Sequence, residues 1–329
     1  MKRIVFATQV VDPEDPNLGA VVGMLRALAA RVDEVVVLAD RAVDGALPDN
    51  CRVRTFGAGS KAGRGRRFVA GLGSELRPKP LAVVAHSVPL YAILAAPLVR
   101  PRGIPLLLWF THWKRSRTLV LAERLSTTVL TVERRSFPFD SPKVFPIGHG
   151  IDTEVFGCVE RERDPRLRAV ALGRTSPAKG LETIARACEF ADVELEIYGP
   201  SITDEERAER DRLIGLGVGM HGPVPYSEVR ELLATRDVLI NNMREGALDK
   251  IVYEAAATCM PVLASNTGFD DVLPPELIFP RDDPTALAAR LRTLRDMDRN
   301  ALGHELRARV ESHHSAGHWA DRVIEAAQR

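Results

Sequence analysis

Residues 167–181 read LRAVALGRTSPAKGL, and this stretch decides the fold of the C-terminal half of the chain. Its apolar run up to Leu172 predicts a buried strand, and a helical pattern starts at Lys179. Ligands of open α/β sheets bind beyond the carboxyl ends of the strands. Arg174 and Lys179, which lie between this strand and this helix, therefore predict a site that grips a diphosphate from two sides. The alternative is that Lys179 is a solvated helix residue.

The same alternation of strand and helix extends over the whole chain. Strands are predicted at residues 3–8, 34–38, 52–56, 81–86, 104–110, 128–132 and 143–146, with helices at 18–32 and 119–125. The pattern restarts with strands at 167–172, 193–198, 238–241 and 261–264 and helices at 179–190, 204–216, 227–234, 248–258 and from 284 onward. Such repeats are typical of parallel sheets covered on both faces, so we predict an α/β protein with two doubly wound, Rossmann-like domains.

A charged segment without a periodic apolar face, Val159–Pro165, is the predicted linker between these domains. It places the N-terminal domain at residues 1–158 and the C-terminal domain at residues 166–312, facing each other across a cleft. Residues 313–329 are predicted to form a helix that packs back on the N-terminal domain.

The composition argues against several classes of function. The 329 residues carry 45 Lys and Arg against 44 Asp and Glu, a net charge of +1, and only 5% aromatic residues, so no nucleic-acid partner is expected. No apolar run approaches the roughly 20 residues of a transmembrane helix, and the run after Met1 predicts a strand rather than a signal peptide. The cysteines lack C-x-x-C spacing and suit neither a zinc site nor a disulfide framework, which favours a reducing, cytoplasmic location. They are Cys51, Cys158, Cys188 and Cys259.

A second group of candidate site residues follows the strand that ends at Asn241. Gly246 lets backbone approach a ligand, and a helix is predicted to begin near Leu248, where its free N–H groups form an anion site beside the two cations. Glu254 lies about two turns into this apolar helix, where a carboxylate can accept both hydroxyls of a ribose. The alternative is that Glu254 pairs with a nearby lysine or arginine.

The first strand of the chain is followed by a loop, Gln9 to Asn17, that leads through Gly19 into a helix. Its position beyond a strand places this loop in a ligand site. Gly19 and Gly23 do not form a dinucleotide fingerprint, and a tight turn at Gly19 is an equal alternative.

Three segments resemble motifs of one family. Arg174–Gly180 resembles the G-R-x-x-x-x-K-G motif of retaining glycosyltransferases of family 4, which have the GT-B fold. Glu245–Ser265 resembles that family's carboxylate helix and the P-V strand after it. Pro146–Asp152 resembles its P-x-x-N-G-V-D segment, with His149 in place of Asn. The order and spacing of all three match, and the resemblance covers nearly the whole chain.

The resemblance implies transfer of a sugar from a nucleotide diphosphate sugar to an acceptor hydroxyl, with retention at the anomeric carbon. Arg174 and Lys179 would bind the pyrophosphate, Glu254 the ribose, and His112 would face the donor sugar. Backbone near Gly199 and Val224 would hold the base, and the amides of Ala247 and Leu248 a phosphate. The implied catalytic residues are His112, Arg174 and Lys179, and the implied donor site is Gly19, Arg174, Lys179, Gly199, Val224, Glu245, Gly246, Ala247, Leu248 and Glu254.

The chain departs from the family at the first carboxylate. The family usually places two glutamates with seven residues between them, but here the residue eight before Glu254 is Gly246, and Glu245 lies one step further upstream. Either Glu245 reaches the sugar through a shifted loop, or Gly246 presents backbone alone and Asp249 and Lys250 take part.

No metal or other cofactor is predicted. Asp296 and Asp298 mimic an Asp-x-Asp metal motif, but they lie in a charged helical region typical of a solvated face. Cations and helix dipoles are expected to neutralise the phosphate charge instead.

A basic segment near residue 65 allows two interpretations. It is either an amphipathic helix that rests on anionic lipid, as a peripheral contact at the inner membrane surface, or a loop entering a solvated helix. Its residues are Lys61, Arg64, Arg66 and Arg67, followed by Phe68, Val69 and Leu72.

Two other functions fit the same phosphate-binding pattern. One is a sugar-nucleotide epimerase or hydrolase, and the other is a non-catalytic sugar-nucleotide binding protein. For a transferase, the acceptor classes left open are a glycan, a lipid-linked molecule and a small molecule.

Overall fold

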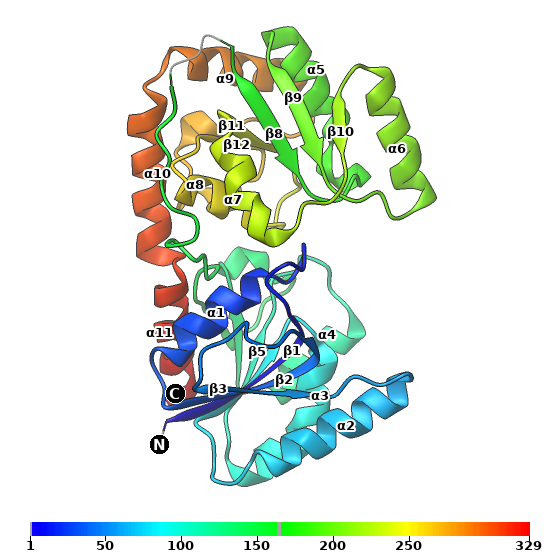
Figure 1. Cartoon of the computed structure of the whole chain (residues 1–329), viewed down its shortest axis with the longest axis vertical. Helices are drawn as coiled ribbons and strands as arrows, with labels where there is room; N and C mark the ends of the chain where they lie inside the picture. The colour runs from blue at the N-terminus through cyan, green and yellow to red at the C-terminus, as the bar shows by residue number, and fades with distance from the viewer. Residues whose placement is uncertain (1, 163–165) are drawn as a thin grey trace. The chain divides into compact units, whose positions relative to one another are not determined.

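The computed structural model describes residues 2–162 and 166–329, which fold as two compact units (Figure 1). The first unit comprises the chain up to Asp152 together with His313–Arg329, and the second comprises Thr153–Ser312. Of the predicted linker Val159–Pro165, residues 163–165 lie outside the described residues, and the rest belongs to the second unit.

The first unit is built on a seven-stranded parallel sheet with the strand order β3-β2-β1-β4-β5-β6-β7. The chain enters at β1, winds to one edge and then crosses to build the other, which makes the sheet doubly wound, as the sequence predicts. The strands are β1 (Arg3–Val11), β2 (Glu34–Ala42), β3 (Cys51–Thr55), β4 (Ala82–His86), β5 (Leu106–Trp109), β6 (Thr128–Thr131) and β7 (Val144–Pro146).

Helices α1 (Ala20–Ala29) and α11 (Ala316–Gln328) lie side by side in the first unit (Figure 1). A hydrophobic core lies under the other helices, α2 (Lys61–Ser74), α3 (Pro89–Val99) and α4 (Arg117–Leu125), and includes the stacked rings of Phe68 and Tyr91. The sequence pattern does not predict α3, because it is apolar on every side and lacks the period of an amphipathic helix.

The C-terminal helix α11 is an integral part of the first unit. The buried indole of Trp319 packs edge-on against Phe6 and Trp109, with ring centroids 6.3 and 6.0 Å apart. Gly148 has a φ of +73°, and a Cβ there would lie 2.0 Å from the carbonyl oxygen of His313. Only glycine therefore lets the Pro146–Asp152 segment lie this close to the start of α11.

The second unit is built on a five-stranded parallel sheet with the order β10-β9-β8-β11-β12. Its strands are β8 (Arg168–Leu172), β9 (Glu194–Tyr198), β10 (Gly219–His221), β11 (Val238–Asn241) and β12 (Val262–Ala264). Its helices are α5 (Leu181–Ala191), α6 (Asp204–Gly215), α7 (Tyr226–Ala234), α8 (Lys250–Ala257), α9 (Pro284–Asp296) and α10 (Arg299–His313). The prediction of two parallel-sheet, Rossmann-like domains is confirmed.

The expectation that no cysteines pair is wrong. Cys158 and Cys259 form a disulfide within the second unit. They are 101 residues apart in the sequence and meet where the segment before β8 reaches the end of α8, with the amide of Val159 donating to the carbonyl of Thr258 at 3.2 Å, so spacing along the chain carries no sign of the bond. Cys51 and Cys188 are free thiols. The cysteines therefore give no support to a reducing location.

The basic segment forms α2, whose apolar side is used within the first unit. Phe68 and Leu72 are buried in the core, Arg64 pairs with Asp40 at 3.0 Å, and Arg67 donates to the carbonyl of Gly57. The apolar face that one of the two interpretations placed on lipid therefore packs in the core of the first unit. Among the described residues, no helix combines the length and hydropathy needed to cross a membrane.

Candidate functional site

The carboxyl ends of adjacent strands β8 and β11 bring together Lys179, Asp249 and Asn241. The ammonium group of Lys179 donates to the carbonyl oxygen of Leu172 at 3.2 Å and forms an ion pair with Asp249. Asp249 also accepts a hydrogen bond of 2.9 Å from the Asn241 amide. A cation that is only 14% exposed is thus held at the sheet edge where ligands bind.

Two glycines make room for this arrangement. Gly173 follows β8 with a φ of +126°, and a Cβ there would lie 2.7 Å from Nζ of Lys179. Gly199 follows β9 with a φ of +151°, and a Cβ there would lie 2.0 Å from the carbonyl oxygen of Gly173. Both positions exclude side chains, so the ends of β8 and β9 lie in close contact and the lysine can reach over the strand end.

Arg174 lies in the same loop as Lys179 but has a different partner. Its guanidinium, half exposed, pairs with Glu206 of α6, which also accepts hydrogen bonds from the amides of Ile202 and Thr203 at 2.7 and 3.2 Å. Although burial acts to raise the pKa of Glu206, these donors and Arg174 lower it below its ordinary value. The two predicted phosphate ligands therefore share one loop, and each is held by its own carboxylate.

Helix α8 begins at Lys250, later than the predicted start at Leu248. The amide of Ala247 donates to the carbonyl of Arg244 at 3.2 Å and closes a turn, so it already has a partner in this conformation, and its role at a phosphate stays a prediction. Ala247 and Leu248 are both buried ahead of the helix. Because the first N–H groups of a helix lack partners within it, the N–H groups of Lys250 and Ile251 are the candidate anion donors at the start of α8.

Glu254 is 3% exposed on α8 and accepts a 2.8 Å hydrogen bond from the hydroxyl of Tyr226. Lys250 lies one turn earlier on the same helix. Burial raises the pKa of the Glu254 carboxyl, while Lys250 and Tyr226 act to lower it. Burial also lowers the pKa of Lys250, an effect that Glu254 opposes. Glu254 therefore interacts with two protein groups, a hydroxyl that donates to it and a neighbouring lysine.

The displaced first carboxylate, Glu245, bends towards Thr267. Its Oε1 accepts hydrogen bonds from the amide and hydroxyl of Thr267 at 3.0 and 3.1 Å. Gly246 has a φ of +79°, which a glutamate at this position would adopt only with strain. Glu245 lines a pocket of about 600 Å³ together with Ser265, Thr267, Asp270, Leu273, Pro275, Ile278, Phe279, Pro280 and Arg281.

The predicted base-binding residues lie at the ends of β9 and β10. The amide of Gly199 donates to the carbonyl of Gly222 at 3.1 Å, and half-buried Val224 leads into α7. Tyr226, the first residue of α7, was missed by the sequence analysis. The available signal was an aromatic hydroxyl at a helix start on the edge that also carries Gly199 and Val224.

Two predicted residues belong to the first unit. His112 is exposed beyond β5, its ring stacks on Trp113, and its Nδ1 accepts from the amide of Lys114 at 3.0 Å. Partial burial lowers the pKa of His112, and the charge of Lys114 lowers it further, so the imidazole is neutral at pH 7. Gly19 lies in the turn that leads into α1, with a φ of −54° that any residue can adopt, so the turn does not depend on glycine, and its role in a ligand site stays a prediction.

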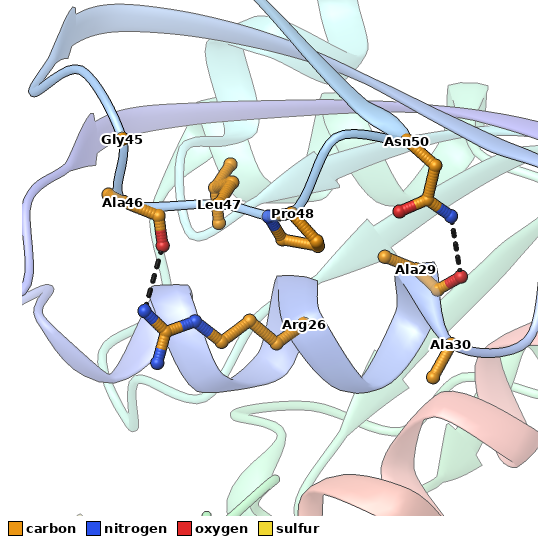
Figure 2. Close-up of a pocket in the computed structure, with 8 residues that line it drawn as sticks. All are labelled: Arg26, Ala29, Ala30, Gly45, Ala46, Leu47, Pro48 and Asn50. Atoms are coloured by element: carbon orange, nitrogen blue, oxygen red, sulfur yellow. Dashed lines mark hydrogen bonds between the residues drawn. The ribbon is translucent and has the colours of Figure 1, made fainter.

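Two pockets lie in the first unit. One, of about 320 Å³, follows the ends of β1 and β2 and is lined by Gln9, Asp40, Phe56, Lys61, Arg64, Gly65, Phe68, Val88, Leu90, Tyr91 and Leu94. The other lies beside α1, where Arg26 donates to the carbonyl of Ala46 at 3.0 Å and Asn50 to that of Ala29 at 2.8 Å (Figure 2). In Figure 2 the side chains of Arg26 and Asn50 both donate to backbone carbonyl oxygens, and we assign this second pocket no role.

The Asp-x-Asp pattern of Asp296 and Asp298 lies between the end of α9 and the start of α10. Asp298 accepts from the amide of Ala301 at 3.0 Å near the start of α10. Within residues 2–162 and 166–329, one group of three ligand side chains is close enough to hold a metal ion, namely Cys158, Cys259 and His304.

Two Rossmann-like units with parallel sheets are the architecture of the GT-B fold. Residues 166–296 match the family model described as glycosyl transferases group 1. No curated protein matches the sequence significantly. Sucrose-phosphate synthase from Thermosynechococcus elongatus is similar in structure, with a TM-score of 0.76 and 18% identity over 100% of this chain and 98% of that chain.

Two further solved structures are similar over the full length. Anabaena HepE, in complex with UDP and glucose, has a TM-score of 0.76 and 14% identity, and covers 100% of both chains. AviGT4, a glycosyltransferase involved in avilamycin A biosynthesis, has a TM-score of 0.75 and 16% identity over 100% of this chain and 98% of that chain. The chain therefore has the GT-B fold, and its residues 166–296 match a glycosyltransferase domain.

Proposed function

We propose that this protein is a retaining glycosyltransferase of family 4, which moves a hexose from a nucleotide diphosphate sugar to an acceptor hydroxyl. The observation that carries the proposal is the position of Lys179, a nearly buried cation at the carboxyl end of β8, in the domain that matches the group 1 transferases. A cation held there suits the diphosphate of a sugar nucleotide, whose negative charge grows as the sugar departs.

The proposed reaction assigns each residue one task. Lys179 exchanges Asp249 for the diphosphate, Arg174 binds a second phosphate oxygen, and Glu254 accepts the ribose hydroxyls. The bond from the anomeric carbon to the diphosphate breaks, the acceptor oxygen bonds to the same face, and the acceptor proton passes to a diphosphate oxygen. His112, neutral at pH 7, is proposed to orient the donor sugar. The step requires no metal, because cations and helix N–H groups neutralise the leaving group.

The first donor to test is a uridine diphosphate hexose, since HepE is similar in fold and its structure contains UDP and glucose. For the acceptor we propose the 320 Å³ pocket of the first unit, where aromatic rings of Phe56 and Tyr91 adjoin the charged Lys61 and Arg64. This combination suits a sugar ring that carries an acidic or lipid-linked group. A cytoplasmic location and a peripheral membrane contact stay predictions, the latter now based on charge alone.

The test separates three outcomes. A thermal-shift panel of nucleoside diphosphates identifies the base, because a ligand in large excess over its Kd raises the apparent stability by a few kcal/mol, about 2.7 at one hundred times Kd. The matching sugar nucleotide is then incubated with and without candidate acceptors, and NMR reads the anomeric configuration of the product. Retained transfer supports the proposal. Turnover of the donor alone indicates an epimerase or hydrolase, and binding without any turnover indicates a binding protein.

A further inference from the structure

Three chemically reactive side chains meet in the second unit, at the opposite end of α8 from the candidate anion donors. Cys259 follows α8, Cys158 lies in the segment before β8, and His304 projects from α10. Nδ1 of His304 is 3.8 Å from the sulfur of Cys158 and 3.7 Å from that of Cys259. A disulfide alone does not require a histidine nitrogen beside both of its sulfurs.

The orientation of His304 is set by a carboxylate. Its Nε2 lies 2.6 Å from Oε1 of Glu160, and the nitrogen donates in this bond because an ionised carboxylate only accepts. Nδ1 is the ring nitrogen that lies beside the two sulfurs, and in the tautomer with the proton on Nε2 its lone pair can bind a metal ion. Metal-binding histidines almost always have such a partner on their second nitrogen, which fixes the tautomer and increases the basicity of the ligand.

The surrounding backbone holds one cysteine in place and leaves the other accessible. The carbonyl of Cys259 accepts from Arg161 at 3.0 Å, and Gly303 of α10 is so close that a Cβ there would lie 2.0 Å from this carbonyl oxygen. Cys259 is buried, whereas Cys158 is partly exposed. A reductant therefore reaches the pair from the side of Cys158, the partly exposed cysteine.

We propose that Cys158, Cys259 and His304 form a redox-controlled site for a soft divalent cation such as Zn²⁺. A tetrahedral zinc ion with Zn–S bonds of about 2.3 Å and a Zn–N bond of about 2.0 Å needs S···N separations of about 3.6 Å and an S···S separation of about 3.8 Å. The S···N distances already lie at 3.7 and 3.8 Å, so only the sulfurs have to separate. Water completes the tetrahedron.

The two states interconvert by a balanced exchange. A dithiol reductant gives two electrons and two protons to the disulfide, which becomes two thiols while the reductant becomes a disulfide. Binding of Zn²⁺ then releases both thiol protons to solvent as the thiolates coordinate the ion. The other thiols compete poorly, because burial raises the pKa of Cys51 to about 11 and that of Cys188 to about 12. This site is independent of the proposed transferase activity.

The test uses the tag-free full chain, either oxidised or reduced with a phosphine, which does not retain zinc as dithiols do. Each form is incubated with Zn²⁺, desalted and analysed for metal by mass spectrometry, and Co²⁺ is added in parallel to detect thiolate charge-transfer absorption. We expect one ion per chain in the reduced protein, none in the oxidised protein, and an unchanged result for Cys51→Ser. Zn²⁺ should also protect Cys158 and Cys259 from alkylation.

Exposed residues provide variants that keep the fold. Glu160→Gln should weaken zinc binding by at least about tenfold, which is the smaller effect usual for loss of a group that bonds to a metal-binding histidine. His304→Gln removes the ligand itself and should weaken binding by at least as much. Circular dichroism checks that both variants remain folded. If the reduced protein retains no zinc, or if Cys259→Ser binds it as well as the original chain does, the pair is a structural disulfide only and the proposal is overturned.

Discussion

Replacement of Lys179 and of Arg174 by alanine should have unequal effects, although both side chains are proposed to bind the diphosphate. The Lys179 side chain is 14% exposed and that of Arg174 is 50% exposed. Two unit charges about 4 Å apart interact by about 4 kcal/mol at an effective dielectric constant near 20 and by about 1 kcal/mol in water. Since about 1.4 kcal/mol is a tenfold change in rate, Lys179→Ala should reduce kcat by up to about a thousandfold, and Arg174→Ala by roughly fivefold.

The assay is steady-state turnover of the donor identified by the nucleotide panel, with calorimetry to measure binding. Arg186→Ala is the matched control, because this exposed α5 residue pairs along its own helix, with Glu182. Lys179→Ala also leaves the charge of Asp249 uncompensated at the site, so the double variant Lys179→Ala/Asp249→Asn separates the lost cation from the added repulsion. Equal losses for Lys179→Ala and Arg174→Ala, or near-normal turnover of the double variant, would refute the reasoning.

Three other perturbations test the site and the fold. Asp249→Asn removes the carboxylate that competes for Lys179 and should tighten nucleoside diphosphate binding about fivefold, for a gain of about 1 kcal/mol, as measured by calorimetry. Glu254→Gln should weaken nucleotide binding. Because burial raises the pKa of Glu254, the nucleotide affinity of the original chain should fall as acidification protonates this carboxylate, whereas the affinity of the variant should not change with pH. In the first unit, Arg52 lowers the pKa of Glu75 below its ordinary value of 4.5. The ionised Glu75 carboxylate therefore stabilises the folded state fully above pH 4.5, and this stabilisation is lost as the pH falls through the lower pKa that Glu75 has in the folded state. Glu75→Gln should cost on the order of 3 kcal/mol in urea unfolding at pH 7, and the two curves should converge in acid.

The sheets were predictable from the sequence because parallel strands are buried on both faces and therefore read as continuous apolar runs. The run at Leu81–His86 becomes β4, and that at Leu167–Leu172 becomes β8, with nearly the predicted bounds. Helix α3 was not predictable by the same means, since an all-apolar segment has no period that distinguishes a helix from a strand. The sequence pattern thus identifies a buried strand by its short apolar run and a helix by its polar face, but not a helix whose exposed positions are themselves apolar, such as Leu90.

The candidate site was predictable in outline but not in its contacts. Motif spacing placed Arg174 and Lys179 in one loop, but the choice of partners depends on distant residues, Glu206 on α6 and Asp249 ahead of α8. The disulfide has the same character, because Cys158 and Cys259 are 101 residues apart and meet where the segment before β8 reaches the end of α8. Contacts between segments far apart in the sequence follow from the complete fold, which no local pattern encodes.

The carboxylate that departs from the family spacing has a physical counterpart in the structure. Glu245 is engaged by Thr267, while Asp249, nearer to the strand ends, neutralises Lys179. In the absence of a ligand this ion pair avoids burying an uncompensated lysine, which would be costly at a nearly enclosed position. A diphosphate that enters must replace one carboxylate with two phosphate groups, so the lysine keeps a counterion in both states. The net free energy gained on binding is then the difference between the lysine–diphosphate and the lysine–Asp249 interactions. This difference grows as negative charge accumulates on the leaving diphosphate. An interaction that is stronger in the transition state than in the bound donor accelerates transfer, whereas an equally strong one would only retain the donor.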